Sequence, residues 1–229
     1  MVQCPALNPF GLPLRFMKNV YFISGLGATK KSFQFLDLSF CNPVFVDWIE
    51  PQKKESLLSY ANRLRATIPE ENPLIVGLSF GGMLAAEMAR ANPGIKAILI
   101  SSNKTSAEFP AYLRVGKYIP AYKWLPNSLV KNSKFLFQWV FGAKGKEQQA
   151  VQLQILKETD MKFTNAAIDM ILQWKSSEPA PKVVHIHGTA DKLLPYKKVK
   201  ADFTIKGGTH LMVMDNGKEV TEILRGLIL

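Results

Sequence analysis

Short apolar runs recur along the chain, and turn-forming residues follow most of them. Six of these runs have the length and the β-branched or aromatic content of buried strands. They cover 19–23, 43–48, 73–78, 95–101, 183–187 and 202–205. Four stretches have the spacing or composition of helices. They cover 30–38, 55–67, 80–91 and 210–227, the last interrupted near Asn216-Gly217. This alternation predicts an α/β fold in three layers, with a mostly parallel six-stranded sheet covered on both faces.

The alternation stops over residues 103–180, which contain several prolines, many aromatic residues and helical stretches. Because the strand pattern resumes afterwards, an inserted helical segment explains this interval better than a separate domain. We therefore predict a single domain over 1–229 with a helical cap inserted at 103–180. Residues 1–16 are interpreted as an extension before the first strand.

The most informative motif is Gly77-Leu78-Ser79-Phe80-Gly81, which joins a predicted strand to a predicted helix. A serine on such a sharp turn projects from the sheet, and small flanking residues let strand and helix approach closely. The N-terminus of the following helix favours the negative charge that develops during acyl transfer. This context indicates Ser79 as a nucleophile.

A serine nucleophile needs a base, and the base needs an acid to orient it. His210 follows the last predicted strand, where a base could reach Ser79. Asp191 comes just after the fifth predicted strand. The order Ser79, Asp191, His210 is that of nucleophile, acid and base in α/β-hydrolases. We interpret His185 and His187, on one face of the fifth strand, as hydrogen-bonded core histidines.

An oxyanion formed on the substrate needs two hydrogen-bond donors. The backbone N–H of Phe80 is one candidate because it follows the nucleophile. The second is expected from the glycine-rich turn Ser24-Gly25-Leu26-Gly27 after the first strand, with Leu26 the candidate donor. Dinucleotide and phosphate-loop interpretations of the glycine-rich segments fail, because Lys30 and Met83 occupy the positions of the required glycine and lysine.

Over nearly its whole length the chain resembles the α/β-hydrolase superfamily. GLSFGG at 77–82, HGTADKLLP at 187–195 and GGTH at 207–210 resemble its nucleophile elbow, acid loop and histidine loop. The resemblance implies the spatial strand order 2-1-3-4-5-6 and a minimal core without the early N-terminal hairpin. It also implies a serine hydrolase that cleaves a carboxylic ester or thioester through an acyl-enzyme. Many members carry His-Gly at the oxyanion loop, whereas this chain has Ser24-Gly25.

Two other functions stay open at this point: a non-catalytic small-molecule binding protein, or a lyase on the same fold. We expect neither a cofactor nor a metal. The expected partner is a small-molecule substrate with an apolar acyl or alcohol group, bound against the aromatic residues of 103–180. Nucleic acid is not expected as a partner.

Composition adds little to this picture. The 29 Lys and Arg against 18 Asp and Glu give a formal net charge of +11, but the basic residues are spread along the chain. They are interpreted as a solvated surface, which adds a secondary expectation that anionic substrates are attracted. With two cysteines, no signal-peptide pattern and no long apolar segment, a cytoplasmic protein without a membrane span is predicted.

Overall fold

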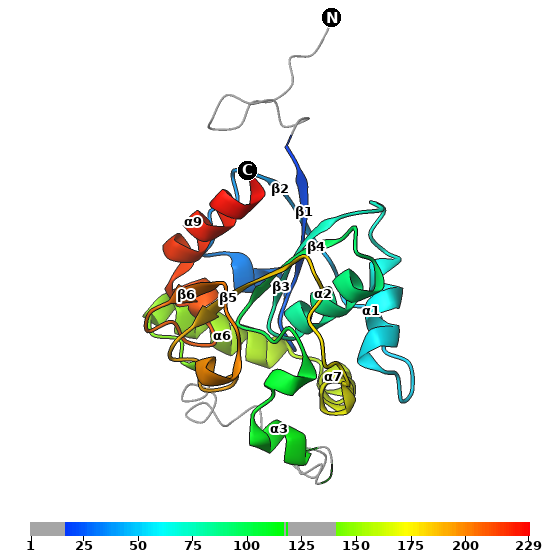
Figure 1. Ribbon diagram of the computed structural model, residues 1–229. Helices are drawn as coiled ribbons and strands as arrows, with labels where there is room; N and C mark the ends of the chain where they lie inside the picture. The colour runs from blue at the N-terminus through cyan, green and yellow to red at the C-terminus, as the bar shows by residue number, and fades with distance from the viewer. Residues whose placement is uncertain (1–16, 117, 119–140) are drawn as a thin grey trace, which may run out of the picture.

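A computed structural model describes residues 17–116, 118 and 141–229. Its sheet has six strands, all parallel, in the order β2-β1-β3-β4-β5-β6, as predicted. The strands are β1 (Asn19–Ile23), β2 (Asn42–Phe45), β3 (Leu74–Leu78), β4 (Lys96–Ile100), β5 (Val183–Gly188) and β6 (Phe203–Ile205). Their carboxyl ends all lie at one edge, the lower edge in Figure 1. Ligands of open parallel sheets bind at this edge.

Helices cover both faces of the sheet (Figure 1). On one face lie α1 (Leu57–Arg65) and α2 (Phe80–Ala91), and on the other lie α8 (Met212–Asp215) and α9 (Gly217–Ile228). Each face has its own apolar cluster, because successive side chains of a strand point to opposite faces. Ile75 and Leu99 pack against α2, whereas Val76 and Ile98 face α9. The predicted three-layer arrangement is therefore confirmed.

The segment between β4 and β5 contains α3 (Ala111–Gly116), α6 (Lys146–Glu158) and α7 (Met161–Gln173). Figure 1 shows α3 and α7 beyond the carboxyl ends of the strands. The buried side chains of α7, Phe163, Ala167 and Met170, belong to the same apolar cluster as α1 and α2. This helix is thus built into the core. That residues 103–180 act as a cap stays a prediction, and Tyr122 and Trp139 of that segment lie outside the described residues.

Two predicted elements are shorter than expected. The helix expected over 30–38 is a single 3-10 turn, Lys30–Phe33, after which a further turn closes with Leu36 N–H on the carbonyl of Phe33. The strand expected over 43–48 ends at Phe45. Beyond it Trp48 leaves the sheet edge, and its indole N–H binds a carbonyl of the loop after β1. The break predicted in the last helix is present between α8 and α9. In the described part of the chain, no helix combines the length and apolar character that a membrane crossing requires.

Candidate active site

Ser79 stands on a strained turn between β3 and α2. Its backbone has φ 51° and ψ −115°, which side-chain-bearing residues rarely adopt. The glycines two positions away are sterically required. A Cβ on Gly77 would lie 2.4 Å from the carbonyl oxygen of Gly81, and a Cβ on Gly81 would lie 2.4 Å from those of Ile23 and Ser24. The close approach predicted from the motif is therefore present.

The backbone of this turn is held by β4, the next strand. Ser79 N–H donates to the carbonyl of Ile100 at 2.9 Å, and the Ser102 hydroxyl donates to the carbonyl of Ser79 at 2.6 Å. Ser101 and Ser102 are fully buried, whereas Ser79 is partly exposed. Of these three serines, only Ser79 is therefore accessible to a substrate.

The structure brings the three predicted catalytic side chains into one hydrogen-bonded row. The Oγ of Ser79 lies 2.9 Å from His210 Nε2, and His210 Nδ1 lies 2.8 Å from Asp191 Oδ2. His210 and Asp191 are buried, with 2% and 5% of their surface exposed. The loops that carry them touch, since Ala190 N–H donates to Gly208 O at 2.9 Å. This geometry permits proton transfer from the serine to the imidazole.

The environment of Asp191 favours its ionised form. Burial acts to raise the pKa of this carboxyl, but His210 next to it and the N–H group of Leu194 outweigh burial, so the pKa is lower than usual. Its Oδ1 accepts hydrogen bonds from Leu193 N–H at 2.9 Å and Leu194 N–H at 2.8 Å. Asp191 is therefore both a turn-stabilising aspartate and the partner of His210.

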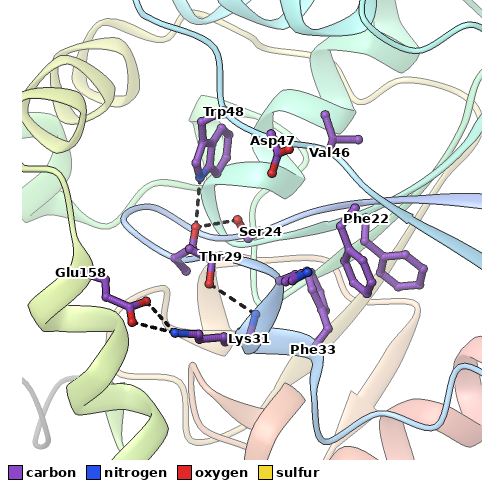
Figure 2. Close-up of a pocket in the computed structure, with 12 residues that line it drawn as sticks. Phe22, Ser24, Thr29, Lys31, Phe33, Val46, Asp47, Trp48 and Glu158 are labelled. Atoms are coloured by element: carbon purple, nitrogen blue, oxygen red, sulfur yellow. Dashed lines mark hydrogen bonds and ion pairs between the residues drawn. The ribbon is translucent and has the colours of Figure 1, made fainter.

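The loop after β1 lies against the nucleophile. A Cβ on Gly25 would be 3.5 Å from the Cβ of Ser79. Ala28 closes the loop, because its carbonyl accepts from the Ser24 hydroxyl at 2.8 Å and from the Trp48 indole at 3.0 Å (Figure 2). Ser24, which stands where many α/β-hydrolases have histidine, thus fixes the turn that holds Leu26.

The inserted segment also supports this loop. Gly27 has φ +67°, and the Thr159 hydroxyl after α6 lies 3.0 Å from its carbonyl oxygen and 2.8 Å from that of Ile155, so its one hydrogen is shared between the two acceptors. Next to it, Lys31 pairs with Glu158 at 2.7 Å, as Figure 2 shows. Phe80, as the first residue of α2, has an N–H group with no acceptor inside the helix. No pattern in the sequence indicates Thr159, because its contact joins residues 132 positions apart.

His185 and His187 are fully buried, in agreement with their interpretation as core histidines. His187 Nδ1 lies 3.0 Å from His185 Nε2, and His187 Nε2 lies 2.7 Å from the carbonyl of Leu194. Leu194 links this pair to Asp191, because its carbonyl binds His187 and its N–H binds the Asp191 carboxylate. No pattern in the sequence indicates that link.

By sequence, the chain matches no protein-family model and no curated protein. Solved structures do match it. A Burkholderia cenocepacia protein assigned as an aryl esterase superposes with a TM-score of 0.70 at 13% identity, over 98% of this chain and 97% of that protein. A carboxylesterase from the thaumarchaeon Nitrososphaera gargenis gives 0.68 at 15% identity, over 93% and 90%. An esterase from Thermogutta terrifontis gives 0.65 at 14%, over 92% and 89%.

These likenesses span nearly the whole of each chain and share the sheet described above. The protein therefore has the α/β-hydrolase fold. At identities of 13–15%, the comparisons establish the fold and leave the activity to be argued from the site.

Proposed function

We propose that this protein is a serine hydrolase that cleaves carboxylic esters or thioesters through an acyl-enzyme on Ser79. The observation that carries the proposal is the continuous row Ser79–His210–Asp191, with contacts of 2.9 and 2.8 Å, on a strained strand-to-helix turn. The esterases among the structural neighbours support the same class of reaction.

In this mechanism His210 Nε2 takes the proton of Ser79 Oγ as the oxygen attacks the substrate carbonyl. The Nδ1–H of His210 donates to Asp191, which holds the imidazole in the correct tautomer and stabilises its cation. The N–H groups of Phe80 and Leu26 bind the oxyanion. His210 then protonates the leaving alcohol or thiol, and a water activated by the same nitrogen releases the acid.

The surroundings of Ser79 favour an apolar acyl or alcohol group. Phe141 packs against the ring of His210, with ring centroids 5.6 Å apart, and the partly buried Trp48 lies in tilted contact with the core rings of Phe80 and Phe163. A cavity of about 310 Å³, lined by Ser24, Ala28 and aromatic side chains such as Phe22 and Phe33, borders the same loop, but neither Ser79 nor His210 lines it (Figure 2). Aromatic walls with a few polar groups are typical of small-molecule sites. Specificity set by residues 103–180 and a cytoplasmic location stay predictions.

A serine-directed fluorophosphonate tests the nucleophile directly. We expect one adduct by intact mass, mapped to Ser79, and no adduct in Ser79→Ala. A panel of p-nitrophenyl esters of increasing chain length, with thioester and amide analogues, then identifies the reaction. The expected result is the highest kcat/KM for an ester or thioester with an apolar chain.

The same experiments separate the alternatives. An adduct on Ser101 or Ser102 would show that the nucleophile is wrongly assigned. Labelling of Ser79 without turnover of any ester, thioester or amide would favour a lyase or a binding protein on this fold. Turnover that survives in Ser79→Ala would exclude the acyl-enzyme.

A further inference from the structure

Two buried histidines lie behind the carboxylate of the row, and the mechanism above does not use them. His185 and His187 project from the same face of β5, and both are 0% exposed. Their rings meet edge to face, with centroids 4.9 Å apart at 81°. A nitrogen of each ring takes part in the 3.0 Å contact between them. These two polar side chains occupy fully buried positions of β5, where apolar side chains are usual.

The contacts fix which nitrogen of each ring carries the proton. Leu194 O, 2.7 Å from His187 Nε2, can only accept, so Nε2 must carry the hydrogen. Burial lowers the pKa of both histidines and keeps them neutral, with one N–H each. His187 Nδ1 is therefore an acceptor, and His185 Nε2 donates to it. His185 Nδ1 is left as a bare acceptor, and it has no partner among the described residues.

The hydrogen bonds of the two histidines lead to Leu194, which also binds Asp191. Leu194 accepts from His187 through its carbonyl and donates to Asp191 Oδ1 through its N–H at 2.8 Å. The same His187 nitrogen lies 3.5 Å from Asp191 Oδ2, the oxygen that faces His210. One N–H group thus faces both the loop carbonyl and the carboxylate. With the opposite tautomer, a lone pair would face these two oxygens instead.

We propose that His187 is a positioning residue for Asp191, and that His185, by donating to His187 Nδ1, reinforces the tautomer that the carbonyl of Leu194 requires. The pair extends the row to Ser79–His210–Asp191–His187–His185. His187 holds Leu194, Leu194 holds Oδ1, and Oδ2 is left aligned with His210 Nδ1. This inference rests on the proposed hydrolase function, because positioning matters only if Asp191 supports the base.

The protonation states can be measured in the wild-type protein without any substrate. Long-range 1H–15N correlation spectra of the histidine rings report the tautomer of each. We expect His185 and His187 to be neutral with the hydrogen on Nε2 at pH 7. A hydrogen on Nδ1 of His187, or a cationic ring at either position, would overturn the inference.

Two substitutions of His187 separate positioning from mere packing. His187→Leu removes the donor, whereas His187→Gln keeps an N–H that can reach the carbonyl of Leu194. With rates normalised to sites titrated by fluorophosphonate, kcat should fall about tenfold in His187→Leu, with KM changed less than about twofold. His187→Gln should recover most of kcat. The downfield proton signal of the His210–Asp191 hydrogen bond should weaken or shift in His187→Leu and return in His187→Gln.

Thr221→Val is the matched control, because it removes a buried hydroxyl that accepts from Asp37 N–H on the opposite face of the sheet. It should lower stability but leave kcat per titrated site unchanged. Equal loss in the leucine and glutamine variants, or an unchanged kcat and proton signal in His187→Leu, would overturn the proposal. If the wild type turns over no ester or thioester, the proposed function fails, and the tautomers and the His210–Asp191 signal still decide whether the pair positions the acid.

Discussion

The two sides of Ser79 are built in different ways. On the side of the acid and base, the loops after β5 and β6 are joined backbone to backbone: a Cβ on Gly188 would lie 2.2 Å from Gly208 O, and Ala190 N–H binds that same carbonyl. On the side of the proposed oxyanion loop, residues 24–27 after β1, contacts come from two side chains distant in sequence, Trp48 beyond β2 and Thr159 of the inserted segment. The sheet therefore fixes the first side directly, whereas the second depends on side chains from other segments.

This contrast has a mechanical meaning. Adjacent parallel strands place the residues that follow them at one edge whatever the side chains are, so the acid and base need only glycines that permit close approach. An oxyanion donor must be placed precisely, and here the Ser24 hydroxyl within the loop, the Trp48 indole and the Thr159 hydroxyl fix the loop. Substitutions on the two sides should differ in severity.

The largest effect is expected at Asp191. Asp191→Asn keeps the size of the side chain but removes the charge that stabilises the His210 cation and selects its tautomer. Turnover should fall by up to about 10⁴-fold. Steady-state kinetics on the best ester measures this, with circular dichroism to confirm folding.

Asp37→Asn, whose carboxylate pairs with Arg225 of α9, serves as the control and should stay within about twofold of the wild type. A wild-type rate in Asp191→Asn would mean that another carboxylate supports His210, and Asp47, Asp169 and Asp215 would be tested next.

The next largest effect, a loss of stability, is expected at Gly81, where α2 contacts the backbone at the end of β1. Gly81→Ala places a Cβ against two backbone carbonyls, of Ile23 and Ser24, which cannot move without disturbing β1. Urea unfolding should show a loss of several kcal/mol. Gly226→Ala on α9 is the matched control, because its Cβ meets nothing within 4 Å, and it should stabilise the helix by up to about 1 kcal/mol. A Gly81→Ala protein as stable as the wild type would contradict the close approach.

Because His185 and His187 are buried behind Asp191, we expect the free energy of unfolding to depend on pH. The pKa of His185 and His187 is lowered in the folded state, so the unfolded chain binds more protons once the pH falls below about 6.5. Stability should therefore fall with falling pH, by at most about 1.4 kcal/mol per pH unit for each histidine, until the folded-state pKa of that histidine is reached.

His185→Gln should reduce this slope between pH 6.5 and 5.5, measured by urea unfolding at several pH values. Asp191, whose pKa is also lowered, adds a further loss only in more acidic solution, near and below the ordinary pKa of a carboxyl. If the unfolding free energy depends on pH equally in the variant and the wild type, His185 has the same pKa in the folded and unfolded states.

The smallest effect is expected on the side of the oxyanion loop. Thr159→Val removes the hydroxyl near Gly27 O while keeping the shape of the side chain. One neutral hydrogen bond contributes about 1 kcal/mol, so kcat should fall less than about tenfold, with KM nearly constant. Thr164→Val removes a hydroxyl that binds only within the α7 turn, and it should leave kcat unchanged. Equal rates in the two variants would mean that the loop holds its shape without the inserted segment.

The sequence predicted those features that depend on local pattern. Most strands are largely apolar runs, and the strand order follows from the resemblance, so the predicted sheet is confirmed with boundaries within a few residues. Ser79, Asp191 and His210 could be selected because each follows a strand, and the structure brings them together. Their catalytic roles stay predictions.

Contacts between distant side chains had no comparable signal. Thr159 and Trp48 reach the oxyanion loop from segments whose folding cannot be read from periodicity. The expected helix over 30–38 was too long because Phe33 and Leu36 have helical spacing, yet the chain turns there to bury both under the sheet. His185 and His187 were correctly placed in the core, but their link to Asp191 runs through a backbone carbonyl, which no residue type reveals.

The sheet order also affects how the chain folds during synthesis. The strands β1, β2, β3 and β4 are complete by Ile100, whereas β5, which covers the exposed edge of β4, begins only at Val183. At cellular rates of translation, this interval lasts on the order of ten seconds. Throughout it, the unpaired backbone of an apolar strand, Lys96–Ile100, offers an edge to any other extended chain. A nascent chain at this stage carries the nucleophile without its base, together with an apolar strand whose edge stays open until Val183–Gly188 is made.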